Sequence, residues 1–312
     1  MKIGYPCINL SLNCRSSSTF RLRSYSAERL ISTVAGNLEG LQQILDFNAD
    51  HGLFFFRLTS DLVPFASHPV CQYDWAAHFG EEFAEIGAFI RRHGMRISMH
   101  PDQFTLLNSP DERVLQNSIA ELNYHARILD LLGLDECAKI QIHIGGVYGD
   151  KEAAINRFIQ RYRQLPLNLR RRLVIENDER HYSLQDCLKI SAQTGVPILF
   201  DVFHHSLLKH GESIPEALKL TAATWKSEDG IPLVDYSSQK PAARVGSHAD
   251  SLHKDNFRKF LRSSRPLDFD LMLEIKDKEK SALMALQLAS RDVRIQKGHR
   301  LSSAHTGGAR AA

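Results

Sequence analysis

The sequence has little of what marks a secreted, membrane-spanning or zinc-finger protein. Its five cysteines are odd in number and scattered, and none forms a CxxC pair of the kind that holds zinc or does redox chemistry. No apolar stretch is as long as a transmembrane helix, and Pro6, Cys7 and Asn9 interrupt the apolar start that a signal peptide would need. We therefore expect a soluble, cytoplasmic protein with no membrane partner.

The sequence also lacks a large net charge, internal repeats and low-complexity blocks. A formal net charge of +3 over 312 residues is too small to indicate a nucleic-acid-binding protein, although local clusters such as Arg170, Arg171 and Arg172 are basic. Only residues 297–312, with Gly, Ser and Ala and little apolar content, are predicted to be a disordered tail. We expect residues 1–296 to form one domain.

What the sequence does have is a regular alternation of short apolar runs and longer segments with helical spacing. Pro110 and Glu112 follow Ser109 in the pattern of a capping box, and the last helix is expected near residues 279–289. Eight units of this kind predict an α/β fold, a single (β/α)8 barrel, with a doubly wound open sheet as the structural alternative. The expected strands are residues 2–8, 53–58, 96–100, 138–144, 173–176, 197–202, 232–236 and 271–275.

Ligand-type side chains recur at the C-terminal ends of these strands, where (β/α)8 barrels carry their reactive groups. Carboxylates converging on one place repel each other unless cations lie between them, and imidazole with carboxylate suits Zn, Mn or Fe rather than Ca. Eight candidates are too many for one ion, so we expect two or three, with Glu176 as the bridging ligand and hydrolytic chemistry. The candidates are His100, His143, Glu176, Asp201, His204, Asp235, His248 and Glu274.

From residue 3 to about residue 289 the chain resembles the UV damage endonucleases, which are grouped with the endonuclease IV type of metal-dependent barrel nucleases. Eight motifs carry the resemblance, and they occur in order at matching barrel positions. They are GYPCIN at 4–9, SMHPDQF at 98–104, HIGG at 143–146, IEND at 175–178, DVFHH at 201–205, DYSSQ at 235–239, GSHAD at 246–250 and MLEIKDKE at 272–279.

The resemblance implies a monomeric nuclease that acts on damaged double-stranded DNA without an organic cofactor. Such an enzyme hydrolyses the phosphodiester on the 5′ side of a UV photoproduct, leaving a 3′-hydroxyl and a 5′-phosphate, with Mn as the metal and Zn or Mg as alternatives. The eight candidates would be the metal ligands, with Glu176 and His68 as catalytic residues. Gln103 and Phe104 would wedge into the duplex opposite the lesion, and Tyr5 and Asn9 would contact the lesion side.

Two residues depart from the family pattern. Relatives can have His where this chain has Asp235, which would change the charge and affinity of that position. Relatives also commonly have Tyr where this chain has Phe104, so any hydrogen bond from that side chain is lost while its stacking face is kept.

Three other functions fit parts of the pattern. An apurinic-site endonuclease would use the same scaffold and metals on a different lesion. A metal-dependent sugar isomerase would need aromatic walls and a catalytic lysine near the metals, and the sequence places no such lysine. A module that senses damage without cutting would not need eight intact ligands.

Overall fold

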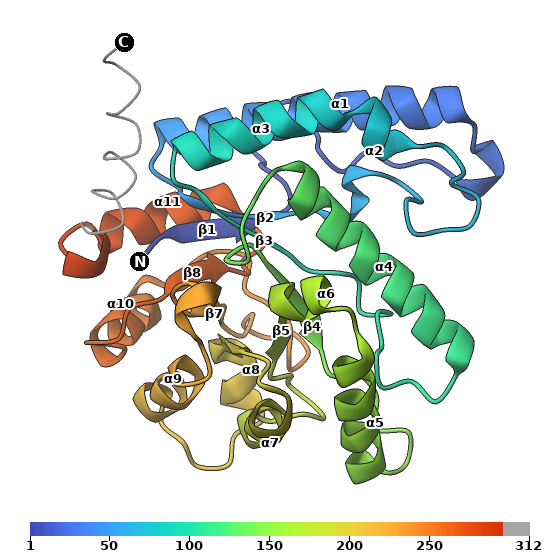
Figure 1. Ribbon diagram of the computed structural model, residues 1–312. Helices are drawn as coiled ribbons and strands as arrows, with labels where there is room; N and C mark the ends of the chain where they lie inside the picture. The colour runs from blue at the N-terminus through green and yellow to red at the C-terminus, as the bar shows by residue number, and fades with distance from the viewer. Residues whose placement is uncertain (296–312) are drawn as a thin grey trace.

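The computed structural model describes residues 1–295 and contains eight parallel strands closed into a barrel (Figure 1). The strands follow one another around the ring in chain order, and β1 closes it against β8, with Ile3 beside Leu271. The predicted (β/α)8 barrel is therefore confirmed. The strands are β1 Ile3–Pro6, β2 Phe55–Leu58, β3 Arg96–Met99, β4 Lys139–His143, β5 Leu173–Glu176, β6 Ile198–Asp201, β7 Leu233–Tyr236 and β8 Asp270–Leu273.

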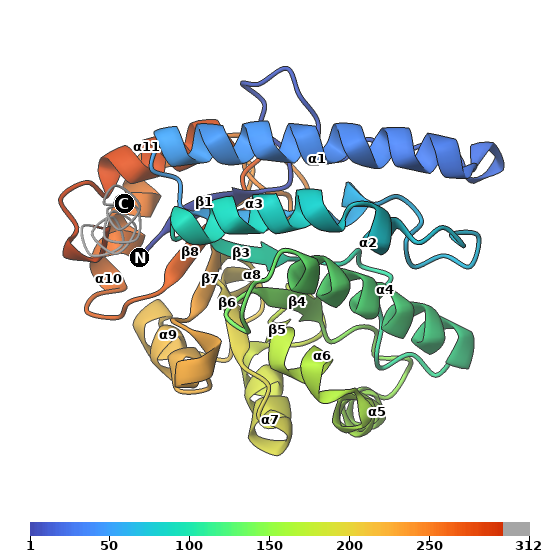
Figure 2. The ribbon, with the colours of Figure 1, turned by 45° about the horizontal axis from the view of Figure 1, so that its top comes forward.

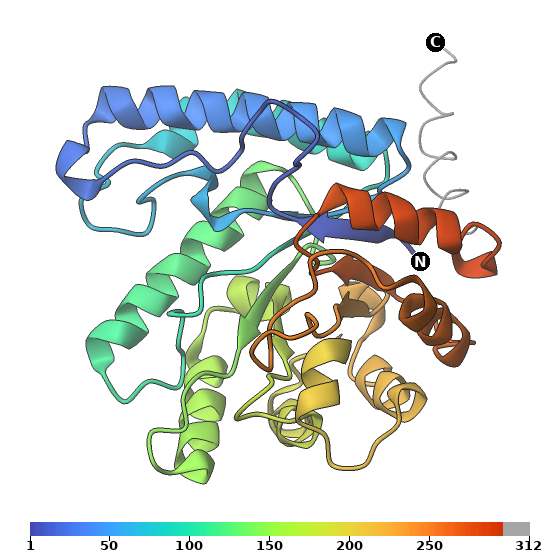
Figure 3. The same ribbon diagram turned by 180° about the vertical axis from the view of Figure 1, so that it is seen from behind.

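Helices cover the outside of the ring, and the first and last elements meet there. Figure 2 shows α1 and α3 side by side along one flank, and Figure 3 shows α11 next to β1. The longer helices are α1 Ala27–Asp50, α3 Gly80–Arg92, α4 Glu112–Leu131, α5 Lys151–Gln164, α7 Leu184–Thr194, α9 Ile214–Ala222, α10 Lys254–Ser263 and α11 Glu279–Leu288. Shorter turns of helix are α2 Trp75–His78, α6 Leu167–Arg172 and α8 Val202–Leu207, with 3-10 turns at Leu22–Ser24, Ser60–Leu62 and Ser227–Asp229.

Each predicted strand overlaps an observed one, and most strand ends differ by one or two residues. The first strand stops at Pro6 because Cys7 adopts a φ of 72°, which turns the chain out of the sheet. Helix α4 is capped by Asp111, whose carboxylate accepts from the backbone N–H groups of Arg113 and Val114. The predicted cap at Ser109 is therefore wrong, and its hydroxyl instead accepts from the Asp111 backbone. The predicted tail, residues 297–312, lies outside the described residues.

Side chains alternate between the barrel interior and the helix-facing exterior, as strand geometry requires. The interior has one apolar layer, formed by Phe55, Val174, Leu199, Leu233 and Met272. Charged side chains lie above and below this layer. The much larger apolar core lies between the outside of the strands and the helices.

Gly4 lets the barrel close tightly at β1. It points inward beside Phe55, and a Cβ at this position would lie 1.9 Å from the Phe55 carbonyl oxygen. A side chain there would push β1 and β2 apart. The next residue, Tyr5, points outward, and this alternation decides its role below.

Candidate metal centre and nucleic-acid face

The inward positions at the C-terminal ends of six consecutive strands carry the predicted ligands. His143 is paired in register with Glu176, and Asp201 with Asp235. His204 comes from the first turn of α8, directly after β6, and His248 from the loop after β7. The strand register therefore brings together side chains that are far apart in the chain.

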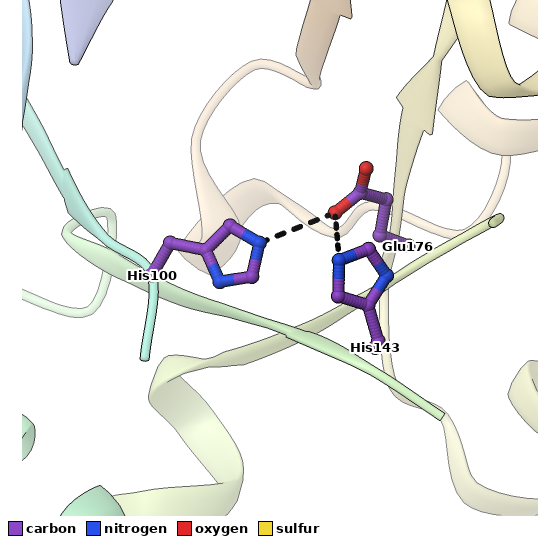
Figure 4. Close-up of side chains that lie close together, drawn as sticks. All are labelled: His100, His143 and Glu176. Carbon is purple, nitrogen blue, oxygen red and sulfur yellow. Dashed lines mark ion pairs between the residues drawn. The ribbon is translucent and has the colours of Figure 1, made fainter. Parts of the chain in front are cut away.

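His100 and His143 face the same carboxylate oxygen (Figure 4). Their Nε2 atoms lie 3.6 and 3.7 Å from Oε2 of Glu176, and the two ring centroids are 5.2 Å apart. The three side chains form a group that could hold a metal ion. Glu176 is buried, so its charge has little access to water.

The other oxygen of Glu176 faces a second group. Its Oε1 lies 3.0 Å from Nδ1 of His204, and the same nitrogen lies 3.7 Å from Oδ2 of Asp201. These three side chains could also hold a metal ion. Glu176 therefore contributes one oxygen to each of two adjacent groups, as a bridging ligand would.

Two of the histidines are oriented by backbone carbonyls. Nδ1 of His248 lies 2.7 Å from the carbonyl oxygen of Glu274, and Nδ1 of His204 lies 3.1 Å from that of Asn177. A carbonyl oxygen only accepts, so each Nδ1 carries a proton and donates it. In neutral His248, Nε2 is then left with the lone pair that a metal ion needs, whereas His204, which Asp201 and Glu176 keep protonated, would have to give up a proton to a metal ion. Carbonyl-anchored imidazoles of this kind are typical of metal ligands. His248 itself belongs to none of the three groups that the described residues form.

A third group of potential ligands contains Asp201, Asp235 and Glu274, and beside it lies Arg57, a residue that the sequence analysis missed. The buried guanidinium of Arg57 donates to both oxygens of Asp235, at 2.7 and 2.9 Å, and forms an ion pair with Glu274. The only sequence signal for Arg57 was its inward position two residues after Phe55.

Gln141 is the second missed residue. Its amide nitrogen donates to Glu176 and, over 2.8 Å, to Asp235, while its amide oxygen accepts from Arg57 over 2.7 Å. It lies inward on β4, two residues before His143. Gln141 therefore ties the first group of ligands to the third.

The electrostatics of the cluster show an excess of negative charge. Burial opposes ionisation of Glu274, but Arg57 holds the pKa of that carboxyl down at about 2. Burial raises the pKa of Asp201 to about 7, and repulsion from Glu176 and Glu274 adds to the effect. Burial also opposes charge on His204, yet Asp201 and Glu176 raise the pKa of this imidazole to about 11. The carboxylates thus favour any nearby cation.

These observations test whether a divalent metal fits the site. The three groups contain four carboxylates, of which only Asp235 and Glu274 are paired with Arg57, and Oδ2 of Asp201 is buried without a hydrogen-bond partner in the described part of the chain. The donors are imidazole nitrogens and carboxylate oxygens, a set that suits Mn, Zn or Fe. The site therefore has both the charge and the donor atoms for divalent metal ions.

A cavity of about 630 Å³ opens beside this cluster. Gln103 lies on one wall with His100 and His143, and Ser247 and His248 form another. Phe104, the next residue of the loop, is 70% exposed, which is unusual for a large aromatic side chain. The predicted wedge residues are thus at the rim of the metal cluster.

His68 lies elsewhere. It lines a separate cavity of about 620 Å³ together with Phe104, and it does not line the cavity of the metal cluster. Its Nδ1 accepts from the backbone N–H of Val70 over 3.1 Å. The structure therefore does not bring His68 to the other candidate catalytic groups.

Tyr5 and Asn9 are inside the protein. Tyr5 is fully buried, and its hydroxyl donates to Asn48 of α1 over 2.7 Å and accepts from Asn9 over 2.9 Å. The side chain points away from the barrel interior, packing against Phe56 with ring centroids 5.2 Å apart. We correct the predicted lesion contact to a structural role, because neither side chain presents a surface to DNA.

The cavity walls also bear on the sugar isomerase alternative. Lys276 and Lys278 line the cavity, so the lysine that sequence analysis could not place is present. Among the described residues, no Phe, Tyr or Trp lines this cavity, whereas a pocket closed around a polyol would be expected to have such walls. One of the two arguments against an isomerase is therefore wrong and the other is supported.

Among residues 1–295, we find no helix with the length and apolar character needed to cross a bilayer.

Comparison with known proteins places the chain among nucleases. The family model described as UV-endonuclease UvdE matches residues 1–303. The UV DNA damage endonuclease of Clostridium perfringens is 38% identical over 290 residues, covering 92% of this chain and 70% of the relative. The crystal structure of SacUVDE is 44% identical, covers 93% of this chain and 98% of its own, and superposes with a TM-score of 0.89.

More distant solved structures share the fold alone. Endonuclease IV from Thermus thermophilus is 15% identical with a TM-score of 0.54, covering 87% of this chain and 96% of its own. An L-ribulose 3-epimerase is 16% identical and has the same TM-score, and the match covers 88% of this chain and 93% of the epimerase. The barrel is thus shared by nucleases and sugar epimerases, whereas the family match is specific: this chain belongs to the UV-endonuclease UvdE family.

Proposed function

We propose that the protein is a DNA repair endonuclease that incises the backbone immediately 5′ to UV photoproducts, leaving a 3′-hydroxyl and a 5′-phosphate. The observation that carries the proposal is the buried cluster of carboxylates and imidazoles beside an exposed Gln103–Phe104 rim. It occurs in a member of the UvdE family, and relatives are named UV DNA damage endonucleases.

Two or three divalent ions, Mn in the first place and Zn or Mg as alternatives, fit the cluster. Bound there, they would supply an activated water and stabilise charge on the phosphodiester under attack. The ligands in this proposal are His100, His143, Glu176, Asp201, His204, Asp235, His248 and Glu274, with Glu176 as the bridging residue. Arg57 already neutralises part of the charge of Asp235 and of Glu274.

Gln103 and Phe104 would recognise damage by entering the duplex. A damaged dinucleotide stacks and pairs poorly, so extruding it costs less than extruding sound bases, and an inserted planar side chain replaces the lost stacking. The exposed ring of Phe104 is suited to this task. Selectivity would then follow from deformability of the DNA more than from hydrogen bonds to a particular base.

The deciding experiment is nicking of UV-irradiated supercoiled plasmid in Mn, with elemental analysis of the same preparation. We expect the irradiated plasmid to be nicked far faster than the untreated plasmid. Equal nicking of both would reject damage-specific incision, and faster cutting of an abasic duplex would favour the apurinic-site endonuclease. A preparation that binds no divalent metal would reject the metal-dependent mechanism.

A further inference from the structure

Lys278 has a backbone conformation that residues other than glycine rarely adopt. Its φ of 53° and ψ of −116° place it at the first central position of a type II′ turn, which the hydrogen bond from Lys280 N to Asp277 O closes at 3.1 Å. Glycine dominates this position because it has no Cβ. A lysine here is strained, and strain of this kind persists where the surrounding structure fixes it.

The structure fixes this turn from both sides. Glu274, four residues before Lys278, is held by its ion pair with Arg57. Glu279, the next residue, is buried and accepts from the backbone N–H of Leu10 at 2.8 Å and from the hydroxyl of Ser11 at 2.7 Å. The chain between two anchored carboxylates has little freedom to relax. As a result, the Lys278 side chain lines the cavity beside the metal ligands.

Lys278 is also the cation of this cavity that has no partner. Arg57 is paired with Asp235 and Glu274, and Lys276 lies 3.3 Å from Asp250. Within residues 1–295, Lys278 forms no side-chain hydrogen bond or ion pair. A positive charge without a partner, held at the wall of a cavity that contains Glu274 and His100, is placed to meet an anionic ligand there.

We propose that Lys278 binds a non-bridging oxygen of the scissile phosphate at the wall of the metal cavity. The inference rests on the proposed nuclease function, because that function brings a phosphodiester to this cavity. This role explains why the strained turn position has a lysine and not a glycine, because the turn directs the Lys278 ammonium group at the substrate. Glycine would relieve the strain and remove the contact.

The test compares Lys278→Gln and Lys278→Gly with Lys280→Gln, which makes the same charge change two residues away and outside the cavity walls. Binding to a duplex with one defined UV photoproduct is measured by fluorescence anisotropy over a range of KCl, in a Glu176→Gln background that prevents incision. We expect both Lys278 variants to bind about tenfold more weakly. The plot of the logarithm of the binding constant against the logarithm of the KCl concentration should become less steep by about 0.9, as expected for the loss of one phosphate contact.

Stability separates this role from a structural one. Lys278→Gly is expected to melt at the same temperature as the parent or about 1–3 °C higher, because backbone strain is relieved. Unchanged affinity and salt slope in Lys278→Gln, or equal losses in Lys280→Gln, would overturn the proposal, as would a lower melting temperature for Lys278→Gly. If the unmodified protein nicks irradiated plasmid selectively and Lys278→Gln nicks it equally well, this inference alone fails. If the unmodified protein shows no selectivity, the proposed function fails first.

Discussion

The two ends of the barrel interior both contain buried charge, but only one end is balanced. At the N-terminal end, Lys139 and Asp229 lie 2.5 Å apart, and Arg96 lies 3.6 Å from Asp270. At the C-terminal end, Arg57 pairs with Asp235 and Glu274, while Glu176 and Asp201 have no lysine or arginine partner among the described residues. The same fold therefore pairs its buried carboxylates with lysine or arginine at one end and gathers more carboxylates than such cations at the other.

This difference in charge pairing suggests that one end of the barrel interior serves stability and the other end serves function. A paired buried charge needs no ligand, and breaking the pair leaves an uncompensated charge that destabilises the fold. Unpaired buried carboxylates repel each other and are stabilised by a bound cation. This agrees with the general rule that (β/α)8 barrels keep their chemistry at the C-terminal face and their stability at the other. The predictions below test this contrast, starting with the largest effect.

Glu176→Gln should reduce nicking of irradiated plasmid by about a thousandfold or more, because one of the two ligand oxygens becomes an NH2 group and the negative charge shared by both ligand groups is lost. Nicking rates and elemental analysis of bound metal measure the effect. Glu152→Gln, an exposed residue paired with Lys189, is the matched control and should leave the nicking rate and the metal content unchanged. A full nicking rate in Glu176→Gln would contradict a functional role for this end of the barrel.

Asp229→Ala should act in the opposite way, by leaving Lys139 buried without its partner. We expect a loss of about 3–5 kcal/mol in the free energy of unfolding, measured by denaturant titration, with the nicking rate per folded molecule unchanged. Adding Lys139→Met should recover part of the loss. No recovery in the double variant would mean that Asp229 acts mainly through its hydrogen bond with the Lys226 backbone.

Adding metal should stabilise the C-terminal end. At a free Mn concentration about one hundred times the dissociation constant, the free energy of unfolding should rise by about 2.7 kcal/mol per site. A chelator should reverse the rise, and Asp201→Asn should reduce it. Differential scanning calorimetry with and without Mn gives the measurement. An identical rise in Asp201→Asn would place the bound ion away from the cluster.

The rim loop should contribute to DNA recognition without affecting the metals. Gln103→Ala combined with Phe104→Ala should slow incision about tenfold to a hundredfold, because base–aromatic stacking contributes about 1–3 kcal/mol per base. Metal content by elemental analysis should stay at the level of the unmodified protein. Loss of metal in the double variant would instead show that the loop supports the cluster.

The smallest effect is expected from Tyr5→Phe, which tests an exception to the contrast. Tyr5 lies within β1, near the functional end of the strand, but its side chain points outward to α1, so its hydroxyl should contribute about 1 kcal/mol to stability and nothing to DNA binding. Chemical denaturation and anisotropy with the same lesion duplex distinguish the roles. Weaker binding with unchanged stability would restore the lesion contact that the structure disfavours.

The sequence by itself determined the architecture and the list of candidate ligands. Eight short apolar runs alternating with segments of helical spacing predicted an α/β fold and favoured a barrel over an open sheet, because local periodicity reflects which residues are buried. The end of a strand is also a local property, so residues such as His143 and Glu176 could be assigned to one edge of the barrel. The eight motifs then indicated the family that the comparisons show.

Only the tertiary structure decided which charges are paired and which face each side chain takes. Arg57 meets Asp235 and Glu274 across 178 and 217 residues of sequence, and no local pattern encodes such contacts. The inward or outward direction of Tyr5 depends on the register of β1 with β2, and the strain at Lys278 depends on anchors in distant segments. The sequence was sufficient to predict candidate ligands because residue type and strand end are local properties, whereas the pairing of their charges is a property of the closed barrel.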